Sequence, residues 1–178
     1  MKSYPFIYKD KQINFRFPVH RIALECNYNQ AVILEHTRSE SEKFARTPYW
    51  IQCPRLISAV HRIESKGWIK ILESFVQGPY QEKWKQFTNE VPQILKNTLD
   101  EKYYLALEAE NRLNVAGVQN PFHLKCLHSH YGFYLVHKKG FVGEFIHGMI
   151  LWKMKREKSN PLGTYCEANF LECEEEND

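Results

Sequence analysis

The order of two kinds of pattern along the chain is the strongest constraint on its fold. Residues 5–36 contain short apolar and aromatic runs, in PFIYKDKQINFRF and AVILEH, that are typical of β-strands. The polar KDKQ predicts a hairpin between two of these runs, and Tyr49 to Gln52 predicts the end of one more strand. From Pro54 onward, apolar residues recur with helical spacing. Strands first and helices after predict an α+β fold, with a small N-terminal antiparallel sheet packed against a mainly helical C-terminal two-thirds.

Prolines and glycines divide the helical part. Pro54 suits the first position of a helix because its missing N–H would have no intrahelical partner there, which places Cys53 at the N-cap. Asn120 and Pro121 likewise predict a helix start, and Pro92 predicts a boundary or a kink. The expected helical segments are 54 to about 67, 68–77, 80–112, about 121–139, closed by Gly140, and 141–156.

Length and composition place the chain among ordinary globular proteins. It has 178 residues, of which 43% are hydrophobic and 25% are charged. A chain of this length can fold without cross-links, so its five cysteines are not needed as disulfides. We expect one domain over residues 1–165 and an acidic tail over residues 166–178. Because no apolar run is long enough to span a membrane and the first residues show no signal-peptide pattern, we expect a cytoplasmic protein with reduced cysteines.

The net charge of +3 hides an uneven distribution. The last eight residues, LECEEEND, hold five of the 21 acidic residues, so the rest of the chain has 24 basic and 16 acidic residues, a net +8. Such a body can bind an anionic small molecule, a protein partner or its own tail, although a solvated surface with a frayed end explains the same pattern. Nucleic-acid binding is disfavoured, because the basic residues are dispersed along the chain.

Two cysteine positions could carry chemistry. Cys53, at a helix N-terminus, would meet free backbone N–H groups and the positive end of the helix dipole, which favour a thiolate. The alternative is a small buried apolar side chain. Cys126 and His130 are four residues apart and would share one helix face, where a thiolate and an imidazole suit zinc. The alternative there is a hydrogen-bonded core histidine.

Four segments of the chain form a more specific pattern. They are Cys26 to Val32, Thr47 to Leu56 with Arg62-Ile63-Glu64 behind it, Pro121 through Lys125-Cys126-Leu127-His128, and Asn160 to Gly163. These segments resemble a bacterial family of unknown function, the domain-of-unknown-function family five hundred and one, whose motifs include T-x-Y-W-L-T-C-P, S-R-L-E, P-x-x-V-K-C-L-H and N-P-x-G. The resemblance runs from residue 26 to about 163, although residues 68–112 are similar only in character. Residues 141–156 resemble an insertion that many relatives lack.

The resemblance implies a set of site residues but no established reaction. Cys26, Cys53, Cys126 and His128 fall on family motif positions, and some relatives carry histidine in place of Cys53. A zinc ligand tolerates that exchange, whereas a nucleophilic thiol does not. Some members lie beside cell-division and polyphosphate-hydrolase genes.

The chain also departs from the family pattern at two positions. Relatives tend to have histidine at the position of Phe133 and an acidic residue at that of Thr164. If the family histidine is functional, His130 or His137 on the same helical side could replace it.

These observations leave a metal site as the first hypothesis. In it, Cys26, Cys53, Cys126 and His128 bind zinc, which is structural with four protein ligands or hydrolytic with three ligands and a water. Cys173 is an alternative fourth ligand. An iron–sulfur cluster on the same cysteines, with Cys166 or Cys173, is disfavoured because no two cysteines are closely spaced.

Two further hypotheses need no metal. One is a thiol enzyme in which Cys53 or Cys126 is the nucleophile, His128 is the base, and Lys125 or Arg62 binds an anionic substrate. The other is a non-catalytic binding or scaffold protein linked to cell division, with its cysteines simply buried. The sequence alone decides neither whether the chain is an enzyme nor what its partner is.

Overall fold

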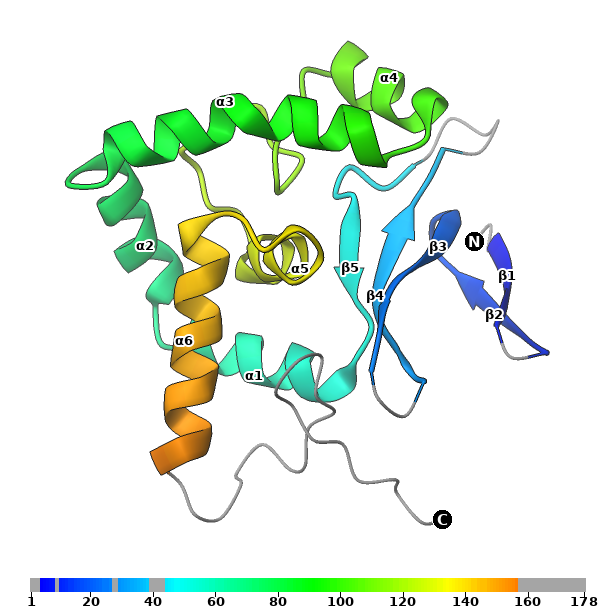
Figure 1. Cartoon of the computed structure of the whole chain (residues 1–178), viewed down its shortest axis with the longest axis horizontal. Coiled ribbons are helices and arrows are strands. Elements are labelled where there is room, and N and C mark those ends of the chain that lie inside the picture. Colours follow the sequence, from blue (N-terminus) through cyan, green and yellow to red (C-terminus); the bar gives the residue numbers. More distant parts are fainter. Residues whose placement is uncertain (1–3, 9, 27–28, 39–43, 157–178) are drawn as a thin grey trace.

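The computed structural model describes residues 4–8, 10–26, 29–38 and 44–156, and it confirms the α+β prediction (Figure 1). The strands are β1 (Tyr4–Tyr8), β2 (Lys11–Phe15), β3 (Val19–Glu25), β4 (Ala31–His36) and β5 (Tyr49–Ile51). The helices are α1 (Pro54–Glu64), α2 (Trp68–Gln77), α3 (Gln81–Thr98), α4 (Glu101–Ala109), α5 (Leu127–His137) and α6 (Phe141–Arg156). The strands form two sheets instead of the expected single one. Among the described residues, no helix is both long and apolar enough to cross a bilayer.

Both sheets are antiparallel. β1 and β2 form the predicted hairpin, and β4 lies between β3 and β5 in the second sheet. β4 is covered on both faces, since Ile33 and Leu34 point to opposite sides and are 0% and 2% exposed. This burial accounts for its apolar run from Ala31 to Leu34. Tyr49, on β5, contacts Phe133 of α5, so one face of this sheet packs against α5.

α5 lies at the centre of the molecule, with β5 and helices α1, α2, α3 and α6 around it (Figure 1). Leu127, Tyr131 and Leu135 are buried on one face of α5, and His130 and Phe133 are buried on nearly the opposite face. Gly132 lies against β5, where a Cβ would be in van der Waals contact with Tyr49. The centre of the core is therefore this helix.

The start of α1 confirms the predicted cap. Cys53 is the N-cap residue in extended conformation, Pro54 follows at the first helical position, and Leu56, Val60 and Ile63 are buried. The chain leaves α1 through Gly67, whose φ of +80° favours glycine. The sequence also correctly predicted α2 and α6.

Pro92 predicted a boundary or a kink; the boundary is wrong, and so is a single helix over residues 80–112. Pro92 lies inside α3, which continues to Thr98. The missing N–H costs one helical bond, and burial of Trp84, Val91 and Leu95 along one side of α3 offsets that cost. The break comes instead at Asp100, whose side chain accepts the N–H of Tyr103 and so caps α4.

The predicted helix start at Pro121 is also wrong, because α5 begins at Leu127 with Cys126 as its N-cap. Residues 121–126 are irregular, and side chains of α2 and α3 bind their backbone. Trp84 Nε1 donates to the carbonyl of Pro121 at 3.0 Å, and Gln77 Nε2 donates to that of Phe122 at 3.2 Å. These bonds satisfy carbonyls that a helix would otherwise have used.

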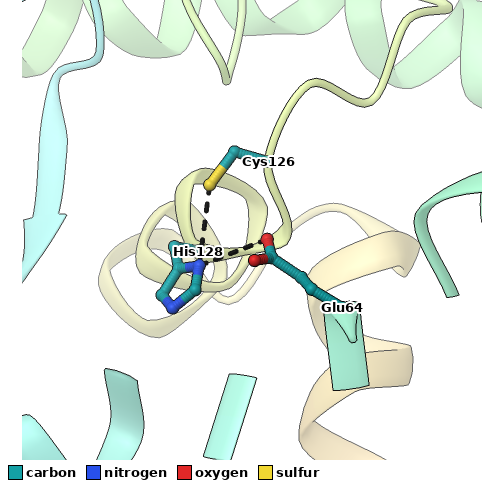
Figure 2. Close-up of side chains that lie close together, drawn as sticks. All are labelled: Glu64, Cys126 and His128. Atoms are coloured by element: carbon teal, nitrogen blue, oxygen red, sulfur yellow. Dashed lines mark hydrogen bonds and ion pairs between the residues drawn. The ribbon is translucent and has the colours of Figure 1, made fainter. Parts of the chain in front are cut away.

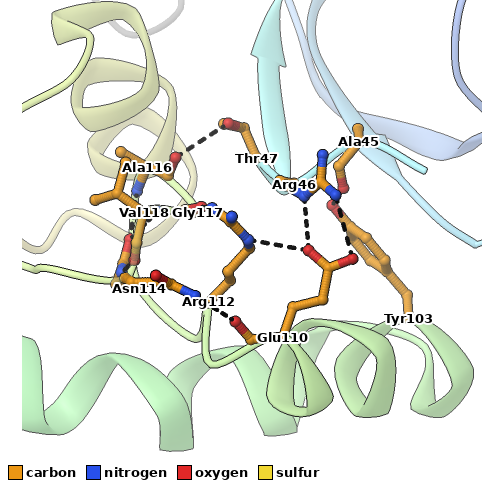
Figure 3. Close-up of polar contacts among 11 residues, drawn as sticks. Ala45, Arg46, Thr47, Tyr103, Glu110, Arg112, Asn114, Ala116, Gly117 and Val118 are labelled. Atoms are coloured by element: carbon orange, nitrogen blue, oxygen red, sulfur yellow. Dashed lines mark hydrogen bonds and ion pairs between the residues drawn. The ribbon is translucent and has the colours of Figure 1, made fainter. Parts of the chain in front are cut away.

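Polar contacts tie the loop after α4 to the chain before β5 (Figure 3). Glu110 binds both Arg46 and Arg112, with the closest N–O distances at 2.6 and 2.9 Å. The hydroxyl of Tyr103 donates to the Ala45 carbonyl at 2.6 Å. The side-chain amide of Asn114 binds Val118, which closes the loop on itself. Asn160 to Thr164, Cys166, Cys173 and the acidic tail lie outside the described residues.

Candidate metal centre

Three side chains that can bind a metal meet where α1 ends and α5 begins (Figure 2). They are Glu64, Cys126 and His128, and one ligand atom from each lies within 4.8 Å of the other two. His128 Nδ1 is 3.6 Å from Cys126 Sγ and 3.2 Å from Glu64 Oε1. All three are half-buried, so their ligand atoms converge at a place that solvent reaches.

A backbone bond fixes the carboxylate at this place. Glu64 is the last residue of α1, and its Oε1 accepts the N–H of Leu127, the first residue of α5, at 2.7 Å. That N–H has no partner within its own helix, and the N-terminus of a helix favours a negative charge. Glu64 therefore caps α5 with its side chain, while the N-cap residue Cys126 leaves its sulfur free of any capping bond.

The hydrogen bonds of His128 define which ring nitrogen faces the group. His128 Nε2 lies 3.1 Å from the carbonyl oxygen of Ile57, on α1. A carbonyl only accepts, so Nε2 carries a proton and donates it. In the neutral ring Nδ1 then presents its lone pair toward Cys126 and Glu64. A metal-binding histidine is usually held in this way, by a bond from its other nitrogen to a backbone carbonyl or a carboxylate.

The site attracts positive charge. Burial acts to lower the pKa of His128, but the hydrogen bond and the charge of Cys126, the charge of Glu64 and the Ile57 carbonyl raise it to about 9. The same neighbours would stabilise a metal cation, which must displace that proton to bind.

The other cysteines predicted as ligands lie elsewhere. Cys26 is buried at the end of β3, where its sulfur accepts the N–H of Gln30 at 3.4 Å. Cys53 is buried at the N-cap of α1. Among the described residues, the structure groups Cys126 and His128 with Glu64, and neither Cys26 nor Cys53 belongs to that group.

The remaining candidates are also placed. Lys125 and Arg62 are exposed, each close in sequence to a member of the group. His130 is buried against Trp84, and His137 Nε2 lies 2.9 Å from the Tyr49 hydroxyl. Neither of these histidines is part of the group.

The prediction from sequence missed the role of Glu64. Glu64 belongs to the segment Arg62-Ile63-Glu64, which resembles a family motif. The spacing of residues along the chain does not link it to Cys126 and His128, more than 60 positions later. The available signal was the coincidence of two family motifs, S-R-L-E at Glu64 and P-x-x-V-K-C-L-H at Cys126 and His128. Motifs far apart in sequence that both contain metal-binding residue types favour a shared site.

The geometry differs from that of a Cys-His-carboxylate triad. In such a triad, the acid holds the imidazole nitrogen that faces away from the nucleophile. Here Glu64 and Cys126 share Nδ1, and the Ile57 carbonyl holds Nε2. Three potential metal ligands converge here, which makes the group a candidate metal site.

Comparisons with known proteins identify a family but no reaction. No curated protein and no solved structure matches the chain. The family described as "Protein of unknown function (DUF501)" matches residues 22–148, a range that includes the three residues of the group and ends within α6. The match covers most of the chain, which therefore belongs to the DUF501 family of proteins of unknown function.

Proposed function

We propose that this chain binds one zinc ion through Glu64, Cys126 Sγ and His128 Nδ1. The observation that carries the proposal is the convergence of these three ligand atoms within 4.8 Å. Zinc would take the position of the proton on Nδ1, whose ring is oriented by the Ile57 carbonyl at Nε2. A thiolate with an imidazole and a carboxylate is a ligand set that favours zinc over magnesium or calcium.

The distances also suit tetrahedral zinc. Bonds of about 2.3 Å to sulfur and about 2.0–2.1 Å to nitrogen or oxygen place neighbouring ligands about 3.5 Å apart for S···N and about 3.3 Å apart for N···O. The corresponding distances from His128 Nδ1 are 3.6 Å to Cys126 Sγ and 3.2 Å to Glu64 Oε1. Both distances from His128 match those of tetrahedral zinc, and the Cys126 and Glu64 ligand atoms lie within 4.8 Å of each other.

Three protein ligands leave a fourth position for water, the arrangement of catalytic rather than structural zinc. Bound zinc would supply a water of lowered pKa, which suits hydrolysis. In this proposal water, not Cys26 or Cys53, completes the coordination. Lys125, exposed beside Cys126, is placed to attract an anionic substrate.

Metal analysis of the purified chain tests the proposal. We expect about one zinc per chain, and a fall in zinc affinity of at least about 100-fold in Cys126→Ser, His128→Asn and Glu64→Gln, because a lost ligand costs more than the 10–100-fold of a lost outer partner. Cobalt in place of zinc should give a sulfur-to-metal absorption band that Cys126→Ser removes.

Two matched variants serve as controls. Cys53 is also a helix N-cap cysteine, and Glu73 also accepts a backbone N–H from the segment before α5, that of Leu124 at 2.8 Å. We expect Cys53→Ser and Glu73→Gln to bind zinc as the unmodified chain does. Zinc-free protein that takes up no added zinc, or uptake unchanged in Cys126→Ser and His128→Asn, would overturn the proposal.

A metal-free thiol enzyme is the second candidate, favoured by the 3.6 Å between Cys126 Sγ and His128 Nδ1. In that case Cys126 would be the nucleophile and His128 its base. Rapid alkylation of Cys126 at neutral pH, slowed in His128→Asn and unaffected by zinc, would favour this candidate over the metal site.

A further inference from the structure

α6 is apolar on two sides. Val142, Ile146 and Ile150 face the core and are at most 2% exposed. Phe145 and Trp152 are seven residues apart, hence on one face, and are 38% and 62% exposed. An exposed aromatic face of this kind, beside the buried one, favours contact with another surface.

This outer face continues onto α2 and the turn that follows it. Trp68 of α2 lies 5.4 Å from Phe145, and Tyr80 lies 5.4 Å from Phe141 and 6.1 Å from Phe75, measured between ring centres. α2 and α6 lie side by side in Figure 1. We name these residues the α2–α6 aromatic patch: Trp68, Phe75, Tyr80, Phe141, Phe145 and Trp152.

The patch gathers an unusual share of the exposed apolar side chains. Four of its members, and Ile71 on the same face of α2, are among the ten large hydrophobic residues that are at least 36% exposed in the described part of the chain. Single exposed apolar residues are ordinary, whereas a contiguous group marks an interaction surface or a membrane contact.

We propose that the α2–α6 aromatic patch docks the protein on an anionic membrane surface. Tryptophan and tyrosine, which the patch contains, favour the boundary between acyl chains and headgroups. No described helix could cross the bilayer, so the proposed contact is peripheral.

Basic residues around the patch fit an anionic partner. Lys83 lies 5.8 Å from the ring centre of Phe141, so one cation is in contact with the patch. In the sequence, Lys153, Lys155 and Arg156 follow Trp152. Basic side chains beside an aromatic patch favour a surface of anionic headgroups over a neutral one.

Vesicle sedimentation tests the proposal. The full chain is mixed with vesicles of phosphatidylcholine alone or of equal parts phosphatidylcholine and phosphatidylglycerol. We expect binding to the mixed vesicles, weaker binding to the neutral ones, and release by salt. Phe145→Ser and Trp152→Ser should each lower the partition coefficient about threefold to tenfold, since each side chain loses part of its apolar burial.

Leu105→Ser is the matched control, because Leu105 is 50% exposed on α4, away from the patch. It should partition like the unmodified chain, and thermal unfolding should show that all three variants are folded. Absence of binding to mixed vesicles, or equal binding by a Phe145→Ser/Trp152→Ser double variant, would overturn the proposal. A dimer in light scattering that Phe145→Ser dissociates would also overturn it, by assigning the patch to a second copy of the chain.

Discussion

Replacement of Gly117 by alanine tests how the loop after α4 is held. Gly117 has a φ of +60°, and a Cβ there would overlap the carbonyl oxygen of Arg46 and lie 2.5 Å from its carbon. The obstacle is backbone, which cannot rotate aside as a side chain does. The loop must therefore move away from residues 45–47, where Glu110 binds Arg46 and the Ala116 carbonyl accepts from Thr47 (Figure 3).

The expected cost has two parts. The left-handed backbone costs an alanine about 1 kcal/mol relative to glycine. Displacement of the loop loses the Arg46–Glu110 pair, worth less than about 1 kcal/mol at an exposed place, and the bond of Thr47 to Ala116, worth about 0.5–1.5 kcal/mol. Together these predict that the free energy of unfolding falls by about 1.5–3.5 kcal/mol.

Gly67→Ala is the matched control. Gly67 also has a positive φ, +80°, but a Cβ there meets no atom within 4 Å, so only the backbone cost of about 1 kcal/mol applies. Urea unfolding followed by circular dichroism measures both variants against the unmodified chain. If Gly117→Ala loses no more stability than Gly67→Ala, the loop does not depend on its contact with Arg46 and the reasoning is wrong.

Three other predictions concern buried polar groups and the metal. Tyr103→Phe should lower the free energy of unfolding by about 1–3 kcal/mol, because it leaves the Ala45 carbonyl unpaired, whereas Tyr104→Phe, at an exposed ring, should stay within about 0.5 kcal/mol in the same urea assay. Burial lowers the pKa of His130 to about 3, so the unfolded chain takes up its proton first as pH falls below about 6.5. The contribution of His130 to the free energy of unfolding should be constant above that pH and fall by about 1.4 kcal/mol per pH unit below it. In urea titrations at several pH values, His130→Leu should remove this part of the pH dependence. Zinc at about 100 times its Kd should raise the free energy of unfolding by about 2.7 kcal/mol, and Cys126→Ser should abolish the rise in thermal melts with and without a chelator.

Local rules predicted the elements that depend on local causes. The hairpin, the cap at Cys53 and Pro54, and α2 each follow from a few neighbouring residues. The two wrong boundaries have a different origin. α3 passes through Pro92 because Val91 and Leu95 are buried, and residues 121–126 stay irregular because Trp84 and other distant side chains bind their backbone. No window of local sequence contains those contacts.

The candidate site was also predictable only where its residues are close in sequence. Cys126 and His128 are two residues apart, so any interpretation of the motif places them together. Glu64 joins them because α1 ends where α5 begins, which is a property of the packed helices. Cys26 and Cys53 were grouped with Cys126 on family motif positions, yet a motif position does not show which side chains meet.

A near-duplicate of the group clarifies what is special about it. Glu73, on α2, accepts the N–H of Leu124 at 2.8 Å, and its Oε1 lies 2.7 Å from Nδ1 of the neighbouring His123. Glu64 does the same at Leu127 and His128.

Glu73 therefore holds the irregular segment before α5 and Glu64 holds the first residue of α5, and a histidine beside each is compatible with that structural role alone. What differs is the third donor and the surroundings. The side chain of His123 is 62% exposed, while that of His128 is 22% exposed and has a thiol at 3.6 Å and a carbonyl that orients its ring. If the carboxylate–histidine pair alone bound zinc, both places would bind it. The zinc proposal requires zinc to bind at Glu64, Cys126 and His128 but not at Glu73 and His123. One zinc per chain, unchanged in Glu73→Gln, would therefore show that the pair at Glu73 has only a structural role.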